Sequence, residues 1–276
     1  MDPKTRYGFK HNPFLPTVPV EDIWLPPRVR LFFQRVSALI RDGGYGAIVG
    51  DPGLGKSKTA QALAWTLTRQ SEDIVVGVMG RPQSKLSDFY RELGDLFGVD
   101  LSPANRYGGF KALRARWREH IRATLFRPVL LVDEAQEMPT ACLNEIRLLG
   151  SAHFDSEVLL TTVLCGDGRL ADRFRGKELL PLGSRVRTRL VLEPYSPDEL
   201  RDFLDHMLER AAVPHLLSDG LKKTLAAHSA GNPRVLCQTA AEMLHAAADR
   251  DLAQLDEGLY LELFAPAARS RKQRAG

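Results

Sequence analysis

The 276-residue sequence has few cysteines and no long apolar run. Its three cysteines, Cys142, Cys165 and Cys237, are odd in number and far apart, which argues against a disulfide framework. No stretch approaches the ~18 apolar residues of a membrane span, and the opening segment lacks the apolar core of an export signal. The seven histidines show no metal-ligand spacing. These absences predict a soluble, cytoplasmic protein with reduced thiols.

An excess of charge of one sign is also missing. Lysine and arginine number 38 against 34 acidic residues, a net charge of +4, and 44% of the residues are hydrophobic. This balance is ordinary for a globular protein, and it is compatible with nucleic-acid binding without indicating it. The length suits one large or two small domains.

Five short apolar runs alternate with helix-length segments, which predicts an α/β fold. The expected strands are YGAIVG at 45–50, DIVVGVMG at 73–80, PVLLVDE at 128–134, EVLLTTVLCG at 157–166 and RVRTRLVLE at 185–193. The expected helices cover 28–41, 56–70, 86–97, 110–125 and 140–152. We therefore expect a five-stranded parallel sheet flanked by helices.

The domain organisation follows from where strands stop and prolines gather. Residues 1–27 carry six prolines and predict an extended arm rather than a helix, and 28–193 form the α/β core. PYSPDEL places Ser196 and Glu199 as a capping box, and Asn232 caps a second helix, so 194–252 form a small helical lid. A C-terminal helix and basic tail are expected at 253–276.

The segment GDPGLGKS at 50–57 matches a phosphate-binding loop, with a strand before it and a helix after it. Glycines let successive N–H groups converge on phosphate oxygens, the lysine reaches the β- and γ-phosphates, and the serine hydroxyl binds Mg²⁺. The expected cofactors are therefore ATP and Mg²⁺. The expected nucleotide-binding residues are Gly50, Asp51, Pro52, Gly53, Leu54, Gly55, Lys56, Ser57 and Lys58.

A second segment, VLLVDEAQ, supplies two acids at the end of an apolar run. Asp133 can take Mg²⁺ through water. Glu134 follows it, and adjacent side chains of an extended chain point apart, so this second acid can meet the attacking water as general base. Small-molecule kinases do not need that second acid, so an ATPase is favoured over a kinase. A capping pair at a strand end is the alternative.

Two further residues are candidates for contact with the γ-phosphate. Asp167 leaves the fourth strand at the sheet edge where ligands bind and could orient the attacking water, although Thr161 and Thr162 compete for that role. An ordinary turn aspartate remains the alternative. Arg234 lies in the first turn of a lid helix and could connect the lid with the γ-phosphate, unless it is a surface arginine.

Three arginines alternate at the fifth strand, in LGSRVRTRL. An arginine donated across a subunit boundary would stabilise the charge of the transition state for hydrolysis. Arg185 is the preferred candidate, with Arg173 and Arg175 as reserves. A solvated edge strand is the alternative interpretation.

These segments, in this order, resemble the AAA+ superfamily and within it the group that includes the ExeA-type ATPases and the transposition regulators TnsC, TniB and MuB. The resemblance rests on YGFKHNPF, GDPGLGKS, LLVDEAQ, LCGDGRL, SRVRTRLVLEPYSPDEL and SAGNPRVL. It implies a P-loop AAA+ core, a Walker A loop, a Walker B pair and a ring or helical filament with nucleotide between subunits. It also implies that Asp167 stands near sensor 1, Arg185 is the arginine finger and Arg234 is sensor 2. The group usually has an uncharged polar residue at sensor 1, so Asp167 departs from the pattern.

A row of basic residues accompanies the expected helix 110–125. Leu113, Trp117, Ile121 and Leu125 recur every four residues as a core stripe. The basic row beside it would follow a phosphate backbone without reading sequence, or it is simply a solvated face. The DNA-binding candidates are Lys85, Lys111, Arg114, Arg118 and Arg122, with the 269–274 tail as a further one.

Taken together, the sequence predicts an AAA+ ATPase that assembles with ATP on double-stranded DNA, recruits or activates a transposase, and disassembles on hydrolysis. The chain stops after the expected lid, whereas ExeA continues into a membrane span and a wall-binding domain, which favours transposition over secretion. The alternatives are a secretion-type ATPase acting on protein and a helicase loader.

Overall fold

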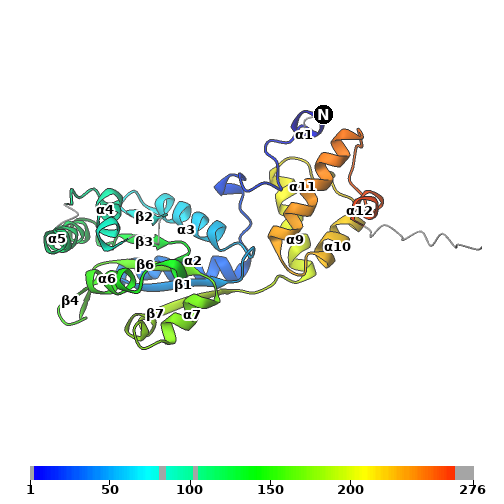
Figure 1. Cartoon of the computed structure of the whole chain (residues 1–276). Helices are drawn as coiled ribbons and strands as arrows, with labels where there is room; N and C mark the ends of the chain where they lie inside the picture. The colour runs from blue at the N-terminus through cyan, green and yellow to red at the C-terminus, as the bar shows by residue number, and fades with distance from the viewer. Residues whose placement is uncertain (1–2, 81–84, 102–104, 265–276) are drawn as a thin grey trace, which may run out of the picture. The chain divides into compact units, whose positions relative to one another are not determined.

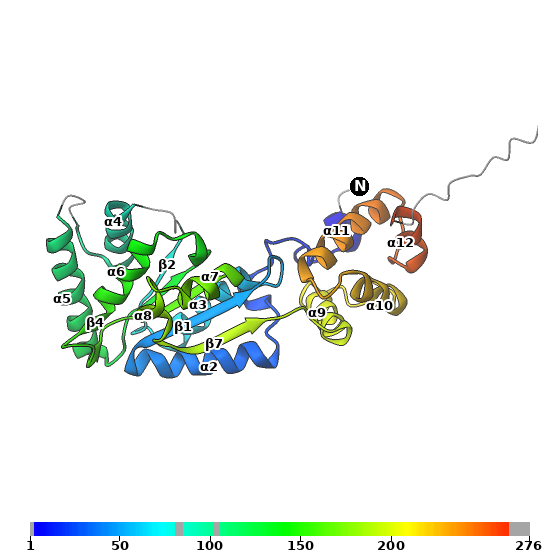
Figure 2. The ribbon, with the colours of Figure 1, turned by 60° about the horizontal axis from the view of Figure 1, so that its bottom comes forward.

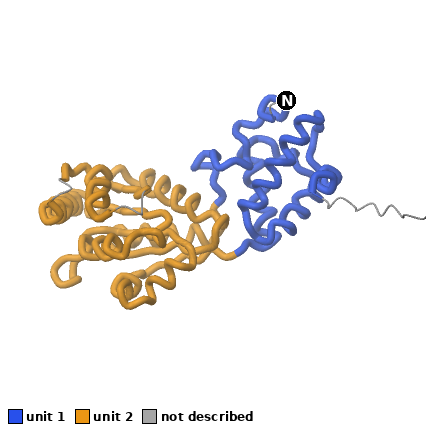
Figure 3. The backbone as a smooth tube through the Cα atoms, viewed as in Figure 1, with its two compact units in different colours: residues 1–24, 194–276 blue, residues 25–193 orange. Residues whose placement is uncertain are grey.

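The computed structural model describes residues 3–80, 85–101 and 105–264 (Figure 1). The chain divides into two compact units (Figure 3). One comprises residues 25–193, and the other combines the residues up to 24 with those from 194 onward. The described residues contain no helix that is both long and apolar enough to cross a membrane.

The unit of residues 25–193 is built on a five-stranded sheet in the order β2-β3-β6-β1-β7, with every neighbouring pair parallel. The strands are β1 (Gly44–Gly50), β2 (Val76–Met79), β3 (Val129–Val132), β6 (Thr161–Gly166) and β7 (Val186–Leu192). This confirms the predicted α/β class and the five-stranded parallel sheet. Because all strands run the same way, their carboxyl ends lie at one edge of the sheet.

Helices cover both faces of this sheet (Figures 1 and 2). Successive residues of β1 show the two layers: a side chain at Gly46 would face Phe32, whereas Tyr45 packs with the opposite helices. The first layer holds α2 (Pro27–Asp42) and α3 (Lys56–Gln70). The other side holds α4 (Leu86–Phe97), α5 (Arg106–Thr124), α6 (Thr140–Gly150), α7 (Gly168–Arg175) and α8 (Leu180–Gly183).

Helix α5 is held to α4 and α6 by apolar and polar contacts. Trp117 of α5 is fully buried and meets Phe97 of α4 edge to face, with ring centroids 5.3 Å apart. Glu145 of α6 is buried, and its carboxylate accepts from the Tyr90 hydroxyl at 2.5 Å and from the Arg106 guanidinium. These partners compensate the cost of burying a charge, so α5 has a fixed place outside α4 and α6.

The second unit is helical. It contains α1 (Pro3–Tyr7), a 3-10 turn η1 (Val20–Asp22), α9 (Pro197–Arg210), α10 (Asp219–His228), α11 (Pro233–Asp249) and α12 (Glu257–Phe264). The predicted capping box at Ser196 and Glu199 is present, with both reciprocal hydrogen bonds. The predicted cap of α11 is present as well, since the Asn232 side chain accepts from the N–H groups of Arg234 and Val235.

The proline-rich segment differs from the extended arm expected from the sequence. Pro3 and Pro27 begin helices, because a proline at a first-turn position loses no helical hydrogen bond. Among residues 3–24, Tyr7 donates its hydroxyl to the Leu252 carbonyl, and the Trp24 ring lies 5.7 Å from Tyr195 and 5.8 Å from Phe203, between centroids, so this segment packs within the helical unit.

The predicted strand at 157–166 and helix at 140–152 also need correction. The helix ends at Gly150, and β4 (Ser151–Ala152) pairs antiparallel with β5 (Glu157–Val158). Three consecutive residues between them, 153–155, have positive φ and reverse the chain. The apolar run therefore contains two strands, because its first residues pair with β4 and only Thr161–Gly166 joins the large sheet.

Candidate nucleotide site

Three neighbouring strands bring the predicted nucleotide residues to one edge of the sheet. β6 lies between β3 and β1, with Val132 paired to Leu164 and Gly166 paired to Val49. Neighbouring strands lie ~4.8 Å apart, so the segments that follow these three strands start within about 10 Å of one another.

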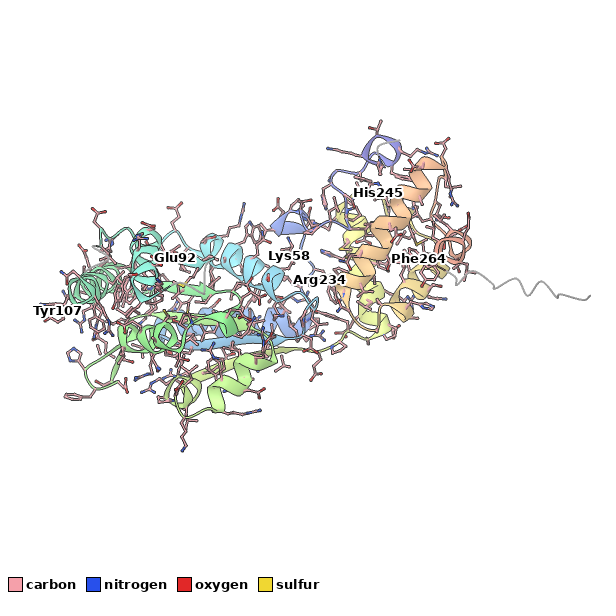
Figure 4. All side chains as sticks on the ribbon, in the orientation of Figure 1. Lys58, Glu92, Tyr107, Arg234, His245 and Phe264 are labelled. Atoms are coloured by element: carbon pink, nitrogen blue, oxygen red, sulfur yellow. The ribbon has the colours of Figure 1, made fainter. Side chains whose placement is uncertain are left out.

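The loop after β1 has the backbone of a phosphate cradle. Gly53 and Gly55 have φ values of 91° and 93°, a region that side chains rarely adopt. A Cβ at Gly50 would lie 2.6 Å from the Leu192 carbonyl oxygen, so only glycine lets β1 approach β7 here. Lys58, labelled in Figure 4, is partly buried, and this burial lowers the pKa of its ammonium.

The position of Lys56 fits an anion. It is the first residue of α3, it is 7% exposed, and its Nζ donates to the Asp51 carbonyl oxygen at 3.2 Å. The residue before it, Gly55, has no side chain to cap the helix, so the positive end of the helix dipole is presented to a bound anion. The loop therefore fits the triphosphate of a nucleotide.

The two acids after β3 adopt a conformation that the sequence did not predict. Glu134 is not extended: its φ is 50°, and its N–H donates to Asp133 Oδ1 at 3.0 Å. We expected the side chains of Asp133 and Glu134 to point apart because the chain would be extended. That premise is wrong. A left-handed turn at Glu134 directs the chain into a 3-10 turn, η2 (Ala135–Glu137).

The buried thiol of Cys165 lies near the end of β6, between the two strands that lead to the predicted charged groups. Burial raises its pKa, and the negative charges of Asp133 and Glu134 raise it further, whereas Lys56 opposes them. All three charged groups therefore act on one atom at the end of β6. The thiol stays protonated and neutral.

A magnesium ion would need ligands from the nucleotide as well as from the protein. The described residues contain no group of three or more His, Cys, Asp or Glu side chains able to hold a metal. Ser57, exposed in the first turn of α3, and Asp133 are the protein groups available. Mg²⁺ commonly uses one or two protein ligands, water and phosphate oxygens, so this set fits it.

Asp167 is occupied as a helix cap. Its carboxylate accepts from Arg169 N–H at 2.9 Å and from the Arg169 guanidinium at 2.8 and 2.9 Å. These hydrogen bonds hold the pKa of Asp167 below its ordinary value. Asp167 is therefore a helix cap in this structure. To orient the attacking water, its carboxylate would have to break its hydrogen bonds with Arg169.

The competing threonines lie at the wrong edge for a nucleotide role. Thr161 and Thr162 begin β6 and pair with Gly44 and Tyr45 of β1, whereas the phosphate loop follows the other end of β1. Five residues of strand span ~16 Å. Thr161 Oγ1 donates instead to the Leu39 carbonyl at 3.1 Å.

The arginine-finger candidates have different partners. Arg185 stands immediately before β7, and its guanidinium binds Asp155 at 2.5 Å. Arg173 donates to the Gln136 carbonyl at 2.6 Å and to Thr140 at 3.1 Å, so it is engaged within its own chain.

The other basic residues of this region are exposed. Arg175 is 80% exposed and pairs with Asp172 on its own helix. Arg187 and Arg189 lie on the solvent side of β7. Thr188, which lies between them, and Leu190, which follows them, are buried. Arg234 belongs to the helical unit, in the first turn of α11 (Figure 4), so its role toward the nucleotide stays a prediction.

The predicted row of basic residues is present on α5, and its members differ in the partners that they contact. Arg118 pairs with Glu157 at 3.2 Å, Arg114 lies 4.9 Å from the Phe110 ring centroid, and Lys111 lies 5.2 Å from that of Tyr107. Tyr107 itself is 73% exposed and is labelled in Figure 4. These aromatic–cation pairs hold two of the positive charges at the surface of the helix.

The other residues named in the DNA-contact prediction lie at the ends of helices or outside the described residues. Leu125 is not part of the core stripe: it ends α5 with φ 65° and is 74% exposed. Lys85 is the N-cap residue of α4. The basic 269–274 tail lies outside the described residues.

Sequence reasoning missed Gln136, which joins two of the site's segments. It is 7% exposed, donates to the Glu134 carboxylate and accepts from the Asp167 N–H. The only signal was its place in the motif VDEAQ, two residues after Glu134.

Comparison with known proteins identifies the fold of the domain that carries this site. Residues 40–174 match the family described as "AAA domain". The structure resembles Cdc6p from Pyrobaculum aerophilum with a TM-score of 0.67 and 17% identity, covering 89% of this chain and 68% of that one. The fold is that of a P-loop AAA domain.

Two further similarities bear on the AAA domain. A chain from the structure of Drosophila ORC bound to DNA matches with a TM-score of 0.67 and 18% identity over 97% of this chain and 67% of that one. In sequence, the chain is 29% identical over 198 residues to "General secretion pathway protein A" of Aeromonas hydrophila. That match covers 70% of this chain, and the chain spans 35% of the relative's length.

Proposed function

We propose that this chain hydrolyses ATP, assembles in the ATP state on double-stranded DNA, and regulates DNA transposition by recruiting or activating a transposase. Hydrolysis would drive disassembly. The ATPase proposal is supported by the strand order, since Lys56 follows β1 and Asp133 and Glu134 follow β3, the two strands on either side of β6, at the carboxyl edge of the sheet.

The proposed chemistry assigns each residue one task. Lys56 and the first turn of α3 would hold the phosphates, and Ser57 and Asp133 would hold Mg²⁺, which would supply positive charge beside them. Water attacks the γ-phosphorus, its proton passes to Glu134, and the bond from the γ-phosphorus to the bridging oxygen breaks to release ADP. A neighbour's Arg185 would stabilise the charge that develops in this step.

The DNA part of the proposal rests on α5. Its exposed positive charges can meet phosphates without reading bases, and repetition over many subunits multiplies a few contacts per subunit. The similarity in fold to Drosophila ORC, whose structure was determined bound to DNA, supports the same class of partner.

The test combines turnover with microscopy. We expect ATP hydrolysis to rise with duplex DNA and with protein concentration, and filaments or rings to form only when a slowly hydrolysed ATP analogue and DNA are both present. Full turnover at high dilution, unaffected by DNA, would contradict the proposal.

An ATPase acting on protein, as in secretion, is the second candidate, and the similarity to General secretion pathway protein A favours it. Hydrolysis that ignores DNA but still depends on protein concentration would support this candidate over the first.

A further inference from the structure

Gln136 forms a bridge between the two loops that flank the reaction. Its side-chain Nε2 donates to Glu134 Oε2, and its Oε1 accepts from the Asp167 N–H at 3.2 Å. Both ends of the amide are therefore used, one on the predicted general base and the other on the backbone after β6.

The surrounding backbone is shaped to make room for this bridge. A Cβ at Gly166 would lie 2.6 Å from Gln136 Oε1, so any side chain there would displace the amide. Glu134 takes a left-handed φ of 50°, an uncommon conformation for a residue other than glycine. Both features permit the Glu134–Gln136–Asp167 arrangement.

The backbone of Gln136 is fixed as well. Arg173 of α7 donates to the Gln136 carbonyl at 2.6 Å and to the Thr140 hydroxyl at 3.1 Å. Since the residue is 7% exposed, its side-chain amide has little access to water and depends on the Glu134 carboxylate and the Asp167 N–H for its hydrogen bonds.

We propose that Gln136 is a positioning residue for the general base, an inference that rests on the proposed ATPase function. A carboxylate base must present an oxygen within hydrogen-bond reach of the attacking water. By holding Oε2, Gln136 leaves Oε1 of Glu134 for the water. Because the same amide accepts from Asp167, a shift of the segment after β6 changes the position of the base, which couples hydrolysis to the state of that segment.

Two substitutions separate positioning from simple packing. Gln136→Glu keeps the shape and the acceptor for the Asp167 N–H, but it loses the donor and places a second negative charge beside Glu134. Gln136→Met keeps the length and loses both hydrogen bonds. We expect both variants to lower kcat about 10- to 100-fold, with the KM for ATP within about twofold of wild type, because the phosphate loop is unchanged.

The matched control is Gln70→Glu, the same chemical change at the exposed end of α3, where Gln70 accepts from the Ser37 hydroxyl at 3.2 Å. It should turn over as wild type does. A Gln136→Glu variant with wild-type kcat would overturn the positioning role, as would a raised KM with kcat unchanged.

A second readout does not depend on activity. The exchange variant Glu134→Gln with Gln136→Glu restores one amide and one carboxylate, so it should melt above Gln136→Glu and close to wild type while remaining inactive. An exchange variant that melts no higher than Gln136→Glu would overturn the contact. If the wild type does not hydrolyse ATP even with DNA, the proposed ATPase function itself is wrong. If the wild type is active and the Gln136 variants are unaffected, only the positioning role is wrong.

Discussion

At the scale of single residues, the candidate site depends on side chains held by neighbours rather than free in solvent. Lys56 rests on a carbonyl of its own loop, Glu134 is held by Gln136, and Asp167 is held by Arg169. Binding of nucleotide would replace the first of these contacts. The second defines the position of the predicted general base, and the third keeps Asp167 as a helix cap.

We expect Glu134→Gln to retain nucleotide and lose turnover. The amide keeps the size of the side chain but cannot accept the proton of the attacking water, so kcat should fall by about 100-fold or more while ADP affinity is unchanged. Stopped hydrolysis should also prolong ATP-dependent assemblies, visible by light scattering. Glu209→Gln, at an exposed site on α9, is the control; loss of nucleotide binding by Glu134→Gln would show that the assignment as base is wrong.

Asp167→Ala gives a pH-dependent prediction. Arg169 and the helix cap hold the pKa of Asp167 below its ordinary value, so the carboxylate stabilises the fold above the ordinary aspartate pKa of ~4, and this contribution is lost as pH falls through the lower folded value. The variant should lose about 1 kcal/mol of unfolding free energy at pH 7 and less below pH ~4, measured by urea denaturation. Asp172→Ala, 75% exposed on the same helix, should change little at either pH.

At the scale of elements, hydrophobic periodicity located most helices and strands well. The bounds of α3 and α4 agree with the expectation because their apolar faces and end residues are local features. Apart from the proline-rich arm, the errors reported above lie where the chain turns without glycine: Leu125, Glu134 and residues 153–155 all have positive φ. Tertiary contacts stabilise such turns, and composition gives no sign of them.

Helix α5 allows a prediction about DNA. Arg122 is exposed, whereas Arg118 already pairs with Glu157 at 3.2 Å, so we expect Arg122→Ala to weaken duplex binding more than Arg118→Ala does. The loss should be uniform across sequences, and the slope of log affinity against log salt should fall by about one. Arg175→Ala on α7 is the control for charge alone. Equal losses for all three variants would indicate a net-charge effect and argue against α5 as the surface.

At the scale of the whole molecule, the Arg185 hypothesis requires two copies of the chain. Its guanidinium binds Asp155 of the same chain at 2.5 Å, so donation to a neighbour's nucleotide would require this pair to open. Arg173 is the weaker candidate because its hydrogen bonds hold the turn that carries Gln136.

We therefore expect Arg185→Ala to bind ATP normally and hydrolyse it poorly, by about 10³-fold if the residue is a finger. Mixing it with Lys56→Ala subunits should restore part of the turnover, because some junctions would then combine an intact loop with an intact arginine. Arg187→Ala, exposed on β7, should keep wild-type turnover. No recovery in the mixture would exclude Arg185 as an arginine supplied between subunits.

The sequence by itself determined the α/β class, the five parallel strands, the phosphate loop and the helix caps, because each depends on periodicity or on residues close together in the chain. Only the tertiary structure decided that Thr161 and Thr162 lie at the far edge and that Gln136 links Glu134 to the segment after β6. Such facts depend on strand order and register, which bring together residues about 30 positions apart, and no local pattern encodes which side chains meet there.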